Sequence, residues 1–178
     1  NQLSRHIRAL SRLIRNTVPC NILKILYHSI VWPHLAYGVI AWGNSCNKEL
    51  KRMSLLQKRA IRIIHRTKYN AHTSPLFNKS NILTLENLYK VQCCKIVHKK
   101  QHNTLPPNIA NLLFTVNETH KYATRHSTDI RPNRTINNLS KQFLSIKVAS
   151  NWNSLPDPLK LSSNLSLPSF TKKLKEFL

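Results

Sequence analysis

The acidic side chains of this chain are few and stand far apart in the sequence. The six carboxylates are Glu49, Glu86, Glu118, Asp129, Asp157 and Glu176. Two-metal phosphoryl transfer needs several carboxylates that converge on Mg²⁺. Because no Asp-Asp or Asp-x-Asp pair is present, the sequence predicts no catalytic residues, no bound metal or cofactor and no enzyme activity for this chain alone.

The histidines and cysteines offer one group with the spacing of a site. Cys94, His98 and His102 recur every four residues on a predicted helix, so they share a face. A metal would need a fourth ligand that the sequence does not supply, and a Cys94 nucleophile would need an orienting acid. The favoured interpretation is a partly buried cysteine with two solvated histidines near a helix end.

Cysteine usage indicates the redox compartment. The four cysteines are Cys20, Cys46, Cys93 and Cys94. They form no Cys-x-x-Cys pair of the zinc-ribbon or thioredoxin type, and adjacent cysteines rarely pair with each other. Without a recognisable signal peptide, we expect reduced thiols in an intracellular protein of the nucleus, the cytoplasm or both.

Basic residues dominate the charge of the chain. There are 28 Lys and Arg residues against 6 Asp and Glu residues, which gives a formal net charge of +22 at pH 7. Self-repulsion of this size destabilises a compact chain unless a polyanion screens it. Nucleic acid, an anionic membrane surface and an acidic protein are the candidate partners. Nucleic acid comes first, by analogy with basic domains in general.

The length and composition of the chain limit the number of domains and the ligand-binding motifs that it can contain. A chain of 178 residues with 41% hydrophobic residues fits one medium domain or two small ones and is long enough to bury a core. Gly38 and Gly43 are the only glycines. Gly-rich phosphate loops and dinucleotide fingerprints need several glycines at short spacing, so both are excluded.

Two predicted helices, over 2–15 and 48–66, separate apolar from basic residues. On the first, Leu3, Ile7, Leu10 and Ile14 fall on one side. Like charges four residues apart repel each other, which favours a phosphate partner for the opposite faces. The basic residues expected to contact nucleic acid are Arg5, Arg8, Arg12 and Arg15 on the first helix and Lys51, Arg52, Lys58, Arg59, Arg62 and Arg66 on the second.

A stretch without any charged residue runs from 25 to 47. By length it could cross a membrane, but its histidines, tyrosines, Pro33 and Gly38 argue against that. The interpretation favoured is a buried helical pair broken near Pro33, with an oligomer interface as the other alternative. No membrane partner is predicted.

The remaining chain is expected to be mainly helical. A short helix begins at Ser74-Pro75, Thr84 caps one that ends near Gln101, and another covers about 108–114. Residues 115–140 are predicted to be irregular with one short β pairing. Helices are predicted over about 143–153 and 168–178. The predicted organisation is therefore a helical domain over 1–102 and a mixed C-terminal extension over 103–178.

Four sequence segments, in this order along the chain, carry a family resemblance. They are LYHSIVWPHLAYG at 26–38 ending in AWG at 41–43, LQKRAIRII at 56–64, HTSPLF at 72–77 followed by NILT at 81–84, and WNSLP at 152–156. Together they resemble the C-terminal part of the reverse transcriptase of non-LTR retrotransposons (LINE elements), of the jockey and chicken-repeat kind. The resemblance covers nearly the whole chain.

The resemblance implies a position within a larger enzyme. Residues 1–102 resemble the helical thumb that follows the polymerase palm, and the rest resembles the C-terminal extension. The family's catalytic palm aspartates and its endonuclease domain have no counterpart here, and Asn1 in place of Met also favours a piece of a longer protein. Polymerase activity, with its Mg²⁺, would belong to the parent protein. The partners implied are the palm and the backbone of RNA, DNA or an RNA–DNA hybrid.

Three other interpretations stay open. One is a structural or interaction domain that packs on the palm or self-associates through residues 25–47. Another is an independent enzyme that uses His and Cys chemistry, which lacks a triad-like arrangement. The third is a decayed element without a selected function.

Overall fold

The computed structural model describes residues 2–9, 11, 18–45, 47–119, 129–132, 134–135, 137, 140–160 and 165–178. These residues are mainly helical, with one two-stranded pairing, which confirms the expected fold class. The chain divides into two compact units, Asn1–Leu88 and Tyr89–Leu178. A domain boundary at residue 102 stays a prediction.

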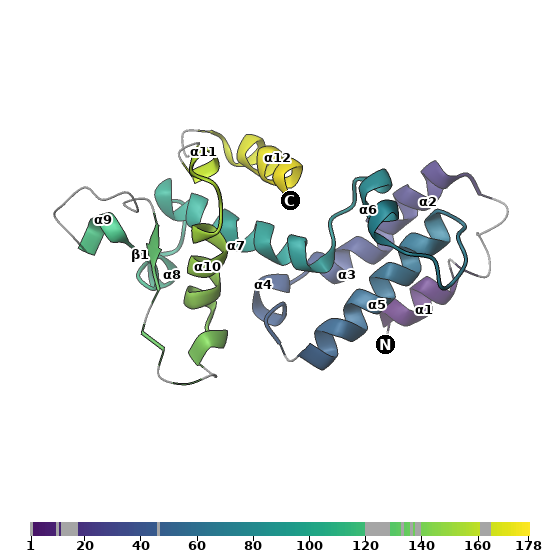
Figure 1. Cartoon of the computed structure of the whole chain (residues 1–178), viewed down its shortest axis with the longest axis horizontal. Coiled ribbons are helices and arrows are strands. Elements are labelled where there is room, and N and C mark those ends of the chain that lie inside the picture. The colour runs from purple at the N-terminus through teal and green to yellow at the C-terminus, as the bar shows by residue number, and fades with distance from the viewer. Residues whose placement is uncertain are drawn as a thin grey trace. The chain divides into compact units, whose positions relative to one another are not determined.

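The first unit is a bundle of helices (Figure 1). Its elements are α1 (Gln2–Ala9), α2 (Cys20–Leu26), the π-helical turn η2 (Tyr27–Val31), α3 (Trp32–Ala36), α4 (Val39–Trp42), α5 (Asn47–Ile64) and α6 (Ser74–Ser80). Apolar residues one helical turn apart bury the inner side of α2 to α4: Leu23, Tyr27, Val31, Leu35 and Val39. This arrangement confirms a helical segment with a buried side, but the predicted break near Pro33 is wrong, because the chain stays helical from Cys20 to Ala36 and leaves the helix at Tyr37.

The π-helical turn in that segment has a local cause. Pro33 lacks a backbone N–H, so it cannot complete a regular helical ladder. The ladder widens just before it, where the Trp32 N–H bonds the Tyr27 carbonyl five residues back. The segment then turns at Gly38, whose φ of 60° lies in the left-handed region that suits glycine.

α5 packs its apolar side into the first unit and against α1. Ala60, Ile61, Ile63 and Ile64 are buried, as are Leu3 and Ile7 of α1. Leu50, Met53 and Leu56, expected on the same face, are only half-buried. Asn47, expected as the N-cap of this helix, is its first helical residue.

A polar side chain that the sequence did not single out joins three segments of the first unit. Gln57 of α5 is 1% exposed. Its amide nitrogen donates to the Tyr27 hydroxyl at 3.1 Å and to the Leu83 carbonyl at 2.8 Å, and its oxygen accepts from the Leu85 N–H at 2.9 Å. Burial raises the pKa of Tyr27 to about 12, so its hydroxyl stays protonated.

The division between the units falls within α7 (Leu85–Gln101). Thr84 caps this helix as predicted, because its hydroxyl accepts the Asn87 N–H at 3.2 Å. The other elements of the second unit are α8 (Pro107–Ala110), β1 (Phe114–Thr115), α9 (Val116–Thr119), β2 (Ile130–Arg131), the 3₁₀ turn η3 (Ser140–Gln142), α10 (Leu144–Asn153), α11 (Asp157–Lys160) and α12 (Leu167–Phe177).

Several predicted elements of the second unit are confirmed and others differ. α10 and α12 match the expected helices within one residue. β1 pairs with β2 in antiparallel fashion, so the expected β pairing forms. The helix predicted over 108–114 is shorter, because it ends at Ala110 and β1 follows. α9 and α11 are single helical turns where irregular chain was expected.

The second unit contains a buried ion pair beside β2. Lys160 of α11 donates to Asp129 at 2.8 Å and to the Asn153 carbonyl at 3.1 Å. The Asn153 side chain accepts the Ile130 N–H and donates to the Ile130 carbonyl, both at 2.9 Å. These bonds hold β2 to the end of α10 in the way that a neighbouring strand would.

Candidate nucleic-acid interface

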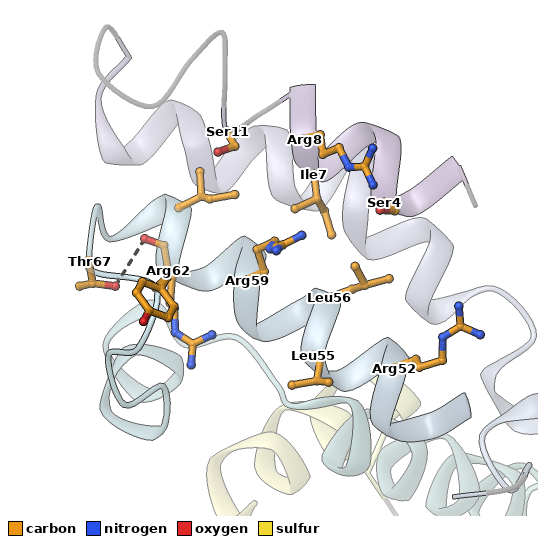
Figure 2. A pocket seen from close by; sticks show the side chains of 12 residues that line it. Ser4, Ile7, Arg8, Ser11, Arg52, Leu55, Leu56, Arg59, Arg62 and Thr67 are labelled. Carbon is orange, nitrogen blue, oxygen red and sulfur yellow. Dashed lines mark hydrogen bonds between the residues drawn. The ribbon is translucent and has the colours of Figure 1, made fainter. Parts of the chain in front are cut away.

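A groove runs between α1 and α5 in the first unit (Figure 2). Its volume is about 800 Å³. The lining side chains come from the two helices, from Ser11 beyond the end of α1 and from the turn after α5: Ser4, Ile7, Arg8, Ser11, Arg52, Leu55, Leu56, Arg59, Arg62, Ile63, Thr67 and Tyr69. The groove exists because both helices bury one apolar side in the unit core and face each other along the next side.

Four arginines from the two predicted basic stripes share this groove. They are Arg8 of α1 and Arg52, Arg59 and Arg62 of α5. Among the described residues that line it, none is Asp or Glu. Like charges this close together repel each other, and in water an anionic ligand is the ordinary way to relieve that repulsion.

The four groove arginines differ in the hydrogen bonds and ion pairs that they form within the protein. The Arg62 guanidinium donates through Nε to the Ala71 carbonyl at 2.9 Å, which fixes it on the turn after α5. Arg52 forms an ion pair with Glu49 at 3.2 Å, an exposed pair that contributes little stability. Arg8 and Arg59 are exposed, and neither has a hydrogen bond or ion pair within the described part of the chain. These two are the cations most available to a ligand.

The other predicted contact residues lie outside the groove lining. Arg5, Lys51 and Lys58 do not line it. Arg66 donates to the Val18 carbonyl at 2.6 Å and closes a turn with its φ at 51°, so its role is at least partly structural. Arg12 and Arg15 lie outside the described residues.

Sequence reasoning missed the groove residues that are not basic. Leu55 is 62% exposed and Tyr69 is 89% exposed, although both are large apolar or aromatic side chains. Ser4, Ser11 and Thr67 add hydroxyl groups to the lining. The sequence held one signal for a groove lining that is both basic and apolar. Leu55 interrupts the basic face of 48–66 with a large apolar side chain.

His65 directly follows α5 but does not line the groove. Its Nε2 hydrogen-bonds the Ser80 hydroxyl of α6. Burial lowers the pKa of His65, and the charges of Lys79 and Lys24 lower it further. A neutral imidazole at this position ties α5 to α6 without adding to the positive charge of the groove.

In the group Cys94, His98 and His102, the first two form part of a packed core, whereas His102 is exposed. His98 is 2% exposed, so the expected solvation of both histidines is wrong for this one. Its ring stacks on Phe170 at 4.7 Å between centroids, and its Nε2 bonds the Leu165 carbonyl at 2.9 Å. A search of the described residues finds no group of three His, Cys, Asp or Glu side chains arranged to hold a metal ion.

Burial also changes the pKa of the two cysteines of the second unit. It raises the pKa of Cys93 to about 11 and that of Cys94 to about 12. Both are therefore thiols at neutral pH, and a thiol is a poor nucleophile. Cys20 is free and exposed, and Cys46 lies outside the described residues.

No helix in the described ranges has both the length and the apolar content needed to cross a bilayer. Comparison of the chain with models of protein families, with curated proteins and with solved structures found no match.

Proposed function

We propose that the chain binds the phosphate backbone of nucleic acid through the basic faces of α1 and α5, as part of a retrotransposon reverse transcriptase. The observation that carries the proposal is the gathering of Arg8, Arg52, Arg59 and Arg62 around one groove without an acidic residue in its described lining. Guanidinium groups bind phosphate oxygens with good geometry, and contacts of this kind carry no sequence preference.

The whole charge of the chain supports the same function. A net charge of +22 raises the local concentration of a polyanion and speeds its encounter with the protein. The family resemblance supplies the expected setting, in which a thumb grips the template–primer duplex for a palm elsewhere in the parent protein. We propose binding for this chain, and catalysis for the parent.

Charge reversal at the two most available arginines tests the proposal. We expect the variant Arg8→Glu/Arg59→Glu to bind a short RNA–DNA hybrid about tenfold or more weakly than the wild-type chain, measured by fluorescence anisotropy at fixed salt. Both side chains are exposed, so the substitutions leave the core intact.

A matched control separates position from charge. Lys172 and Lys173 of α12 are also exposed, and Lys172→Glu/Lys173→Glu changes the net charge by the same amount. We expect this control to lose less than about threefold in affinity. Equal losses in both variants would mean that total charge alone attracts the nucleic acid, and the proposed site would be wrong.

Exposed apolar residues on α2 favour a second candidate function, a surface that packs on the palm or on another copy of the chain. Ile22 is 46% exposed and Ile25 is 63% exposed. Over 25–45, Tyr27, Val31, Leu35 and Val39 are buried within the first unit, whereas Leu26, Ile30, Trp32 and Trp42 are only half-buried. Self-association that persists at high salt in light scattering, together with unchanged nucleic-acid binding in the arginine variant, would favour this alternative.

A further inference from the structure

The groove between α1 and α5 is the size of a small-ligand site. A volume of about 800 Å³ lies within the range of pockets that enclose a nucleotide or a drug-sized molecule. A double helix is too broad to enter such a space and could contact only side chains that are exposed, such as Arg8 and Arg59. The side chains inside the groove therefore need an explanation beyond contact with a duplex backbone.

The lining combines the two surfaces that a nucleotide needs. The arginines and the hydroxyls of Ser4, Ser11 and Thr67 suit a phosphate and a sugar, whereas Leu55, Leu56 and Ile63 suit the flat apolar face of a base. In Figure 2 the arginines and leucines of α5 stand next to one another along the same side of the helix. In a duplex the base faces are stacked on one another and out of reach.

We propose that this groove seats unpaired nucleotides of a single strand, with their phosphates on the arginines of the groove lining and a base against Tyr69. The inference rests on the proposed function and names the form of nucleic acid that enters the groove. In a template–primer, the unpaired part is a single-stranded extension beside the duplex.

The exposure of Tyr69 favours a base as the occupant. Its side chain is 89% exposed at the edge of a groove, and it follows α5 by only a few residues. Aromatic rings that line a positively charged groove are the usual stacking platforms for single strands. An acidic peptide would satisfy the arginines equally well, but its carboxylates have no flat face to lay on Tyr69 or Leu55.

Three nucleic-acid probes distinguish the affinity contributed by a base from the affinity contributed by the phosphates. The first is a blunt RNA–DNA hybrid, the second is the same hybrid with a single-stranded extension of about four nucleotides, and the third carries an abasic extension with the same phosphates. Stacking of one base adds at least about fivefold in affinity. We expect the full-length chain to bind the second probe at least that much more tightly than the first or the third.

Variants at tyrosine locate the stacking surface. We expect Tyr69→Ala to remove most of the gain from the base-bearing extension, and Tyr69→Phe to keep it. Tyr37 provides the matched control, because it is 86% exposed in the same unit and does not line the groove. Tyr37→Ala should therefore leave the gain unchanged.

Each contrary outcome has a distinct meaning. An abasic extension that binds as tightly as the base-bearing one would overturn the inference, as would a gain that survives Tyr69→Ala. Displacement of the extended hybrid by an oligo-glutamate peptide, at the concentration of an equally charged single strand, would assign the groove to an acidic peptide instead. If Arg8→Glu/Arg59→Glu still binds the blunt hybrid normally, the proposed function itself fails.

Discussion

At the scale of single residues, Gln57 shows how one buried amide organises the first unit. Its side chain completes three hydrogen bonds, to η2, to the segment before α7 and to the first turn of α7. A buried amide is tolerated because its donors and acceptor are satisfied. The same bonds fix which side of α5 faces the core, and thereby which side carries the arginines toward the groove.

Replacement of Gln57 by leucine should therefore destabilise the chain. Gln57→Leu keeps the volume but leaves the Tyr27 hydroxyl, the Leu83 carbonyl and the Leu85 N–H without this partner. We expect a loss of about 2–4 kcal/mol in the free energy of unfolding, measured by denaturant titration. Lys51→Ala on the exposed side of the same helix is the control, with an expected change within about 0.5 kcal/mol. A loss of less than about 1 kcal/mol for Gln57→Leu would show that water replaces these bonds.

The sequence could not identify Gln57, because a glutamine among lysines and arginines has the appearance of another surface residue. Only the positions of Tyr27, Leu83 and Leu85 around it show that it is buried. The basic residues were predictable for the opposite reason. Arginine and lysine side chains remain on the surface in nearly every fold, so helical spacing alone placed them.

At the scale of elements, α12 is attached to α7 through His98. The imidazole stacks on Phe170 and bonds the Leu165 carbonyl, and Trp152 of α10 lies 6.2 Å from Phe170 between ring centroids. Burial lowers the pKa of His98, the Leu165 carbonyl opposes that shift, and the charge of His102 adds to it. The folded state therefore favours neutral His98.

This lowered pKa predicts acid sensitivity of the second unit. Stability from neutral His98 is fully present above the unfolded-state pKa of 6.5, and it is lost as the pH falls toward the lower folded-state pKa. We expect the free energy of unfolding to fall between about pH 7.5 and about pH 5, and His98→Gln to reduce that fall. His102→Gln, an exposed neighbour, should change the dependence much less. If the wild-type chain and His98→Gln lose the same stability on acidification, then His98 does not titrate on unfolding.

Helices of this chain were predictable where apolar residues repeat with helical spacing over several turns. α5, α10 and α12 have that pattern, and their ends match the expected ones within about one or two residues. α7 was predicted from its cap at Thr84 instead, because its buried residues lie on all sides of the helix. The single turns α9 and α11 were not predictable, because four residues hold too little pattern to exceed the surrounding polar chain. The π turn at η2 was not predictable either, because it depends on how the backbone hydrogen bonds before Pro33 rearrange.

At the scale of the whole molecule, the net charge and the groove arginines both attract a polyanion, the first at long range and the second on contact. The net charge of +22 acts over distances comparable with the screening length of the solution, whereas the groove arginines act on contact. The charge was readable from the sequence. The groove was not, because it depends on how α1 packs against α5, and helical spacing on one element says nothing about the element that faces it.

The salt dependence of binding is the measurement that tests the central claim most directly. Each phosphate neutralised in a duplex contributes about 0.9 to the slope of log K against log salt. We predict that Arg8→Gln/Arg59→Gln lowers the slope for a blunt RNA–DNA hybrid by about 1.8, while Lys172→Gln/Lys173→Gln leaves it nearly unchanged. An arginine variant with the slope of the wild-type chain would contradict the account, because its groove cations would then contact no phosphate.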